Sequence, residues 1–122
     1  MSFSTAGTDG PRLDGAALAR LDLGHNVWGS LPSAADARRA AELFRGAGWR
    51  VRLSSRTEYE VECTFAELEI LPVRPVTFAG FVDPDRVGVL LAALEGMGLS
   101  FEVEFTDAEG RDHLHRSNGH PH

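Results

Sequence analysis

Glutamates stand at alternate positions in three stretches of the sequence, and they are the first residues that could carry chemistry. The acidic positions are Glu60, Glu62, Glu67, Glu69, Glu102 and Glu104. Alternation with apolar residues is typical of a strand with one buried and one exposed face. Arg50 and Arg52 are the basic residues placed with them. We expect an acidic sheet face that docks a basic protein; the alternative is a solvated strand surface.

Four histidines near the end of the sequence form a candidate metal site. They are His113, His115, His120 and His122. Neutral imidazoles ligate Zn, Ni or Cu. The surrounding segment has no hydrophobic period, so the metal itself would have to organise the site. The alternative is a polar tail that binds metal only adventitiously.

No nucleophile or acid–base constellation stands out in the sequence. Cys63 is the single cysteine. It alternates with Val61 and Tyr59, which favours a buried strand residue over a catalytic thiol. His25 follows Gly24 in a turn, without a nucleophile or an orienting carboxylate at motif spacing. The paired glycines follow helices, whereas phosphate loops precede them, so no cofactor is expected and a non-enzymatic protein is favoured.

Four aromatic residues support an alternative function. They are Trp28, Trp49, Phe78 and Phe81. Most are expected in the core, but some could line a cleft between the helices and a curved sheet and hold a small apolar ligand. The alternative is therefore a ligand-binding or sensory domain, with a homodimer through exposed sheet edges or faces as one form of it.

The composition bounds the class of protein. The chain has 122 residues, of which 43% are apolar, enough for one globular domain. The net charge is −6 and all 12 basic residues are arginines, which disfavours binding to nucleic acid or to an anionic membrane. No apolar run approaches a membrane span, and the first residues lack the features of a secretory signal. We expect a cytoplasmic protein.

Two helices are predicted. Ser33 is a favoured N-cap, and an apolar stripe of helical period runs from there to about Arg45, where glycines end the helix. Asp83 and Pro84 begin a second helix with a clear apolar stripe. Residues 16–23 fit either a short strand or a helical turn.

Strands are predicted around these helices. Their positions are 27–31, 49–53, 59–63, 76–82 and 101–105. A hairpin with Val51 opposite Val61 places Arg52 across from Glu60, and opposite charges facing each other are mildly favourable. The alternation then changes parity, so a turn or bulge is expected at Thr64 to Ala66.

The two halves of the chain match at a shift of fifty positions. Residues 15–53 superimpose on 65–103 without gaps, and the caps Ser33 and Asp83 coincide. Equal spacing over this length favours a repeated unit of strand, helix and strand.

This element order resembles the ferredoxin-like fold. The resemblance implies an α+β domain with an antiparallel-rich sheet and both helices on one face, with one or two extra strands at 58–73. The start of each module is also similar to the glyoxalase and bleomycin-resistance superfamily, but that family needs three further strands after the second helix. We predict a flexible leader (1–14), one α+β domain (15–106) and a flexible histidine-rich tail (107–122).

These patterns favour a non-enzymatic protein-binding domain. Its acidic sheet face would cover a basic site on a partner, as an immunity or inhibitor protein covers a nucleic-acid-acting toxin. RNA-binding sheets of similar fold present aromatic and basic residues instead, so this function is not expected.

Overall fold

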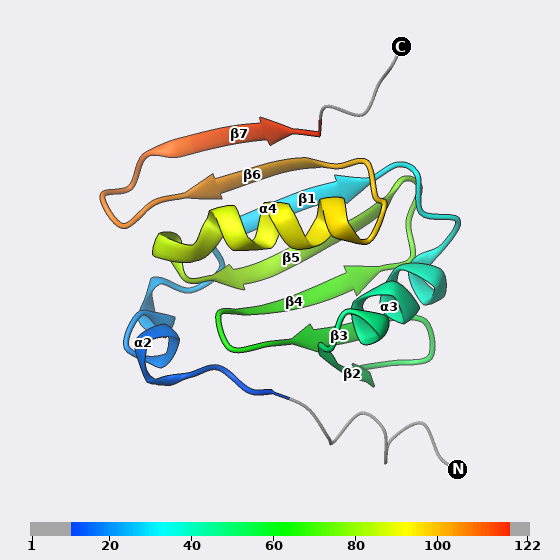
Figure 1. The fold of residues 1–122 in the computed structure, drawn as a ribbon, viewed down its shortest axis with the longest axis horizontal. Helices are drawn as coiled ribbons and strands as arrows, with labels where there is room; N and C mark the ends of the chain where they lie inside the picture. The colour runs from blue at the N-terminus through cyan, green and yellow to red at the C-terminus, as the bar shows by residue number, and fades with distance from the viewer. Residues whose placement is uncertain (1–10, 118–122) are drawn as a thin grey trace.

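Seven strands form one antiparallel sheet in the computed structural model, which describes residues 11–117. The strand order is β2-β3-β4-β5-β1-β6-β7 (Figure 1). The strands are β1 (Val27–Leu31), β2 (Arg50–Leu53), β3 (Tyr59–Glu62), β4 (Ala66–Leu71), β5 (Val76–Val82), β6 (Glu102–Thr106) and β7 (Asp112–Arg116). The sheet is open, and β2 and β7 are its edges.

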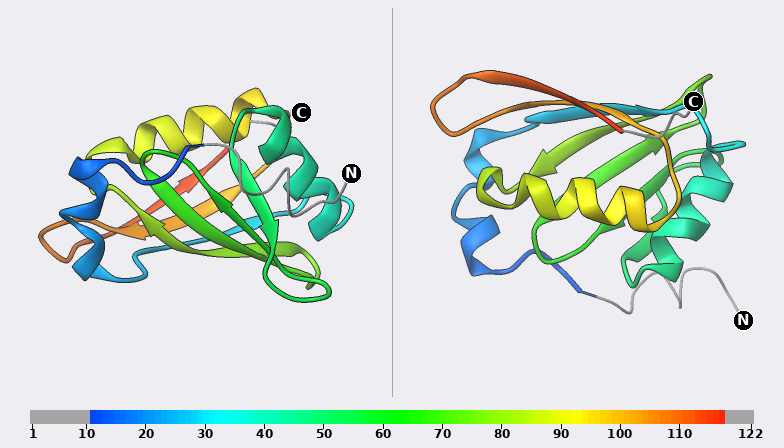
Figure 2. Two further views of the ribbon diagram at one scale, coloured as in Figure 1. Left: turned by 90° about the horizontal axis from the view of Figure 1, so that it is seen from below. Right: turned by 45° about the horizontal axis from the view of Figure 1, so that its top comes forward.

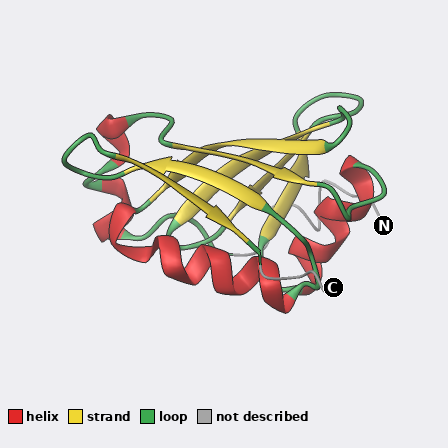
Figure 3. Ribbon diagram, turned by 90° about the horizontal axis from the view of Figure 1, so that it is seen from above, coloured by secondary structure: helices red, strands yellow, loops and turns green. Residues whose placement is uncertain are grey.

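Five helical segments accompany the sheet within residues 11–117. They are α2 (Gly15–Leu18), the short 3₁₀ turn η1 (Leu21–Leu23), α3 (Ala37–Gly46), the 3₁₀ turn η2 (Pro84–Arg86) and α4 (Val87–Gly96). α3 and α4 pack against the same face of the sheet (Figure 2; Figure 3). The predicted mixed helix-and-strand fold with an antiparallel sheet is confirmed. Residues 16–23 form helical turns rather than a strand.

The start of α3 differs from the prediction. Asp36, not Ser33, is the N-cap, and its carboxylate accepts the Arg39 N–H at 2.7 Å. Ser33 lies in the preceding turn, where its hydroxyl oxygen accepts the Ser100 N–H at 2.8 Å. Both residues are favoured caps. The Ala34 N–H donates to the Leu31 carbonyl, so the chain completes a turn before it enters the helix.

The core fills the space between the sheet and the two long helices. Along β4, Ala66, Leu68 and Ile70 are buried under α3, while Glu67 and Glu69 point the other way. The same alternation runs through the other inner strands, which explains why apolar residues recur with period two. The sheet therefore has a helix-covered face and a second face without either long helix, which we call the open face.

The β2–β3 hairpin has the predicted register. Val51 pairs with Val61, and Arg52 pairs with Glu60. The change of parity also falls where expected, because β3 ends at Glu62 and β4 begins at Ala66. The Cys63 N–H donates to the Ala66 carbonyl at 2.9 Å across this tight turn.

The predicted structureless tail is wrong for residues 112–116, which form β7 and pair with β6. The Phe105 ring stacks on the His113 and His115 imidazoles at centroid distances of 4.8 and 5.8 Å. The sequence does not predict this strand, because His113 and His115 occupy the alternate positions at which apolar residues usually indicate a strand. Residues 118–122, with His120 and His122, lie outside the described residues.

The end of the predicted leader is also tied to the domain. The Leu13 N–H donates to a Glu62 carboxylate oxygen at 3.0 Å, and the Asp14 N–H donates to the Thr64 carbonyl at 2.9 Å. Residues 1–10 lie outside the described residues. The ordered chain therefore begins before position 15.

The two halves of the proposed repeat are not placed equivalently in the sheet. β1 and β2, which flank α3, are separated by β5, β4 and β3, whereas β5 and β6, which flank α4, are separated by β1 alone. The hairpin of β3 and β4 accounts for this difference, since it occupies the space between β5 and β2.

Candidate functional site

The six glutamates predicted to form a surface all lie on the open face. One row of facing residues crosses the whole sheet there. In strand order it contains Arg52, Glu60, Glu69, Ala79, Trp28, Glu104 and Leu114. A second row brings Arg50, Glu62, Glu67 and Phe81 together. Residues paired across an antiparallel sheet share a face, so the register places these carboxylates on one surface.

Three of these glutamates are neutralised by arginines. Glu60 bonds to Arg52. Arg50 Nη1 lies 3.3 Å from Glu62 Oε1, and Arg116 Nε lies 2.6 Å from Glu102 Oε2.

The other three glutamates are Glu67, Glu69 and Glu104. None of them forms an ion pair with a residue that the structure describes. The uncompensated negative charge therefore lies over the middle of the open face.

Like charges stand directly opposite each other across β3 and β4. Glu62 pairs with Glu67, and Glu60 pairs with Glu69. Burial raises the pKa of Glu67, and the carboxylates of Glu62 and Glu60 raise it further. Facing like charges destabilise a sheet. The fold thus carries an electrostatic strain at this surface that its two edge arginines relieve only in part.

Trp28 is the large apolar side chain at the centre of this charge. It is 44% exposed and lies between Ala79 and Glu104 in the row. A hollow of about 190 Å³ flanks it on the side of Ser30 and Thr77, and another of about 250 Å³ on the side of Thr106. The sequence predicts Trp28 in a ligand cleft, whereas the structure places it on the open face. Trp28 lies two positions before the polar Ser30, so both side chains point to the same face of β1, and this spacing is the sequence signal for the open face.

A third hollow of about 170 Å³ lies where the N-terminal segment meets the open face. Glu67, Glu69 and Ala79 form part of its floor, and Leu21 and His25 form part of its wall. The loop that carries His25 is therefore part of the candidate surface, a role that the turn-like sequence did not reveal.

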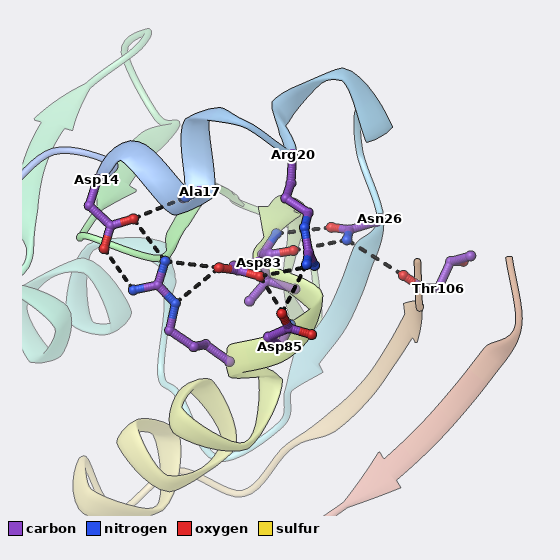
Figure 4. Close-up of polar contacts among 9 residues, drawn as sticks. Asp14, Ala17, Arg20, Asn26, Asp83, Asp85 and Thr106 are labelled. Carbon is purple, nitrogen blue, oxygen red and sulfur yellow. Dashed lines mark hydrogen bonds and ion pairs between the residues drawn. The ribbon is translucent and has the colours of Figure 1, made fainter. Parts of the chain in front are cut away.

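An ion-pair network fixes this N-terminal segment (Figure 4). Both Arg86 Nη groups donate to the Asp14 carboxylate at 2.8 Å, and Arg86 also bonds to buried Asp83. Arg20 reaches Asp85 at 2.9 Å and Asp83 at 3.6 Å. The Arg86 guanidinium holds the pKa of Asp14 well below its usual range. The network joins α2 to the start of α4, and we assign it a structural role.

Buried Asn26 holds the start of β1 in the same region (Figure 4). Its side chain donates to the Val82 carbonyl and accepts the Val82 N–H, both at 2.9 Å. Its backbone carbonyl accepts the Thr106 N–H at 2.8 Å. These bonds fix the position at which the His25 loop joins β1, and they therefore also position the wall of the third hollow.

The structure does not bring the four predicted cleft aromatics together. Trp28 and Phe81 are on the open face, while Trp49 and Phe78 are buried on the helix side. The Trp49 ring packs edge-on against Phe44 at 4.8 Å, between their centroids. The four residues are therefore divided between the two faces of the sheet, and of the four only Trp49 and Phe78 belong to the main core cluster.

A hollow between sheet and helix exists elsewhere, next to the edge strand β2. It measures about 430 Å³ and lies between α3 and β2–β3. Its lining is Arg38, Ala41, Glu42, Arg45, Val51, Leu53 and Tyr59. None of the predicted site residues within 11–117 lines it.

The described histidines do not form a metal centre. His113 Nε2 lies 2.8 Å from an Asp107 carboxylate oxygen, and His115 stacks on Phe105. Within residues 11–117, no three His, Cys, Asp or Glu residues are grouped so that they could hold a metal ion. Two of the four predicted ligands, His120 and His122, lie outside this range.

Cys63 is a buried thiol, as its position in the alternation suggested. Burial raises its pKa to about 11. At neutral pH the side chain is therefore protonated and a poor nucleophile.

No protein-family model, curated protein or solved structure matches this chain. Among the described residues, no helix is long and apolar enough to cross a membrane. The class that these observations define is a mixed α and β domain with an open seven-stranded antiparallel sheet. Any function must therefore be argued from the geometry of the molecule.

Proposed function

We propose that this chain is a non-enzymatic binding domain that docks a basic protein partner on its open face. One observation carries the proposal: within residues 11–117, Glu67, Glu69 and Glu104 form no ion pair with an arginine, and Glu69 and Glu104 lie on either side of the exposed Trp28 in one row of the open face. A partner that supplies arginine or lysine would neutralise carboxylates that the fold leaves uncompensated.

The charge balance of the open face supports a cationic partner. Seven carboxylates point from it: Glu60, Glu62, Glu67, Glu69, Glu102, Glu104 and Asp112. Three arginines point from it: Arg50, Arg52 and Arg116. The face therefore has a formal charge of −4. Such a field accelerates the approach of a basic protein and repels nucleic acid.

Trp28 supplies the apolar part of this surface. Exposed tryptophans are common anchors in protein interfaces, and an indole face attracts a guanidinium or ammonium group. A cation placed over Trp28 lies between Glu104 on one side and, across the small Ala79, Glu69 on the other. An immunity- or inhibitor-type protein that covers a basic active site is one concrete form of this function.

The test uses nona-arginine as a cationic probe. Amide shifts in a two-dimensional NMR titration should change on the open face, and the affinity should fall as salt rises. The double variant E69K/E104K should weaken binding at least about tenfold. E95K/E109K, which makes the same charge change on α4 and in the β6–β7 turn, is the matched control and should bind nearly as the unaltered chain does.

Equal loss in both double variants would mean that only net charge matters, and shifts centred on α3 and α4 would place the site elsewhere. Either result contradicts the proposal. A natural partner recovered from the source cell should then show the same dependence on E69K/E104K.

A second candidate is a small-ligand or sensory function at the hollow beside β2. Its floor is apolar at Val51 and Leu53, and its rim carries Arg38 and Arg45 beside Glu42. This lining suits an apolar ligand with one negative charge. A thermal-shift screen with medium-chain carboxylates tests it. Stabilisation that disappears in L53E would favour it, and no stabilisation by any of them would count against it.

The proposed duplication of strand–helix–strand units, with a ferredoxin-like arrangement, has topological support. Without the β3–β4 hairpin, the order of the remaining inner strands would be β2-β5-β1-β6. We regard the hairpin as an insertion into such a unit. In a related chain that lacks residues equivalent to 58–73, β2 should pair with β5, and any other pairing would contradict the duplication.

A further inference from the structure

The edge strand β7 has a set of backbone groups that point away from the sheet. In its ladder with β6, the Ser117 N–H donates to the Phe101 carbonyl at 2.9 Å, and the Asp107 N–H donates to the Arg111 carbonyl at 2.8 Å. Bonded and non-bonded pairs alternate along an antiparallel ladder.

His113 and His115 therefore make the intervening bonds to β6. The N–H and C=O groups of Asp112, Leu114 and Arg116 point outward. All five residues of β7 are exposed, and Leu114 is 49% exposed. Such an edge is a template for another strand.

The side chains of β7 are complementary to a second copy of themselves. In an antiparallel pair with a two-fold axis at Leu114, the two Leu114 side chains face each other. Asp112 of each copy faces Arg116 of the other, on both sides of the axis. These are the three positions whose backbone groups point outward, so each facing pair can exchange both of its N–H···O bonds.

Asp112 and Arg116 each have a contact within their own chain, and these contacts still allow the pairing with a second copy. Arg116 donates from Nε to Glu102, and the rest of the guanidinium fork still carries donors. Asp112 accepts a bond from the Thr106 hydroxyl through one oxygen at 2.8 Å. A carboxylate has further lone pairs for a second donor.

The opposite edge does not share this complementarity. β2 carries Arg50 and Arg52 on either side of Val51. In a two-fold pair centred on Val51, Arg50 of each copy would face Arg52 of the other. In a pair centred on Arg52, the two Arg52 side chains would face each other. Self-pairing of β2 is therefore opposed by charge.

We propose that two copies of this chain associate through β7, in an antiparallel pair centred on Leu114, to form one continuous sheet. The two-fold axis is perpendicular to the sheet, so both open faces lie on the same side. This inference goes beyond the docking function and does not depend on it. A single short strand pair is a small interface, so the dimer is weak and depends on concentration.

Two measurements test the pairing on the whole chain. Sedimentation velocity between about 10 µM and 1 mM should show a reversible shift from monomer to dimer, in the range expected of small interfaces. Amide exchange followed by NMR should show protection of Asp112, Leu114 and Arg116 that rises with concentration, while His113 and His115 stay protected throughout. A monomer at every concentration, or concentration-dependent protection elsewhere, would overturn the proposal.

Charge exchange identifies the partner strand as a second copy. D112R alone and R116D alone place like charges across the pair and should weaken dimerisation at least about tenfold. The double variant D112R/R116D restores opposite charges and should recover the dimer. E109R changes the charge by the same amount in the adjacent turn and should leave the dimer intact.

L114P provides a second variant that does not depend on charge. Because the Leu114 N–H points away from β6, proline at an edge removes the outward donor without removing a β6–β7 bond. The far-ultraviolet circular dichroism should be retained and the dimer lost. A dimer unaffected by L114P and by both single charge reversals would show that another surface is used.

Discussion

Trp28 and Glu104 face each other across β1 and β6, on the side of the sheet without the long helices. An exposed indole face and a carboxylate without an ion-pair partner can both contact the same cation. This pair, with Glu69 beyond Ala79, is the centre of the proposed docking surface.

Replacement of this tryptophan should separate binding from stability. W28A should weaken nona-arginine binding about two- to fivefold, the range of an exposed cation–π contact. W28F should retain most of the affinity. Because Trp28 is nearly half exposed, W28A should lower the free energy of unfolding by only about 1 kcal/mol.

W49A is the matched control for this experiment. Trp49 lies between the Phe44 and Phe65 rings in the core, so its truncation should cost about 3–5 kcal/mol of stability. If W28A binds the probe with normal affinity, the indole of Trp28 does not contribute to the proposed site.

Asp14 should make the N-terminal segment sensitive to acid. The Arg86 guanidinium lowers the pKa of Asp14 in the folded chain. A depressed carboxyl pKa contributes stability above the unfolded value, about 4, which is lost as the pH falls through the folded value. D14N should therefore melt below the unaltered chain at pH 7, and the difference should shrink below about pH 4.

D22N, which alters an exposed carboxylate on η1, serves as the control in the same thermal scans. A D14N deficit that stays constant down to pH 2.5 would mean that the charge of Asp14 is not the stabilising feature.

The open face could be predicted because period-two alternation is local information. Glu67 and Glu69 follow from their apolar neighbours, and the β2–β3 register follows from a short turn. The position of Trp28 was harder to predict, since β1 has only five residues and an indole there suits either face.

Other features depend on contacts that are distant in the sequence. β7 has no apolar alternation, because His113 and His115 stack on Phe105 in place of aliphatic residues. Asp36 and Ser33 are equally good caps by residue type, and the turn after β1 decides between them. The strand order requires knowledge of which strands meet, and the β3–β4 hairpin changes it.

Gly29 should be intolerant of a larger residue. A Cβ there would lie 2.5 Å from the Phe78 ring, and Phe78 is fully buried and cannot move aside. G29A should lower the free energy of unfolding by about 1–3 kcal/mol. In α4, G88A meets no atom within 4 Å and should raise it by about 0.5–1 kcal/mol. Urea unfolding of both variants checks the pair, and equal effects would refute the packing argument.

Cys63 should report on unfolding rather than on function. With a pKa of about 11, its thiolate fraction at pH 8 is about 200-fold below that of a free cysteine. Modification by a disulfide reagent such as DTNB should be at least that much slower in the folded chain, and it should become rapid in urea. Fast modification of the folded chain would contradict the buried position.

Glu67 should show that the docking surface lowers stability. Burial and two neighbouring carboxylates raise its pKa, so the folded chain takes up protons more readily than the unfolded chain. Its stability contribution therefore falls as the pH rises through the unfolded value, about 4.3, toward the higher folded value.

E67Q removes a charge that faces Glu62 directly, and it should stabilise the fold at pH 7 by about 0.2–1 kcal/mol. The gain should vanish below about pH 4, where Glu67 is protonated in both states. The same variant should bind nona-arginine more weakly. Urea unfolding and the NMR titration, performed on one preparation, measure the two effects together. If Glu67 contacts the partner, its removal must lower the affinity. A variant that gains stability and keeps full affinity would therefore mean that the repulsion at Glu67 serves some purpose other than binding.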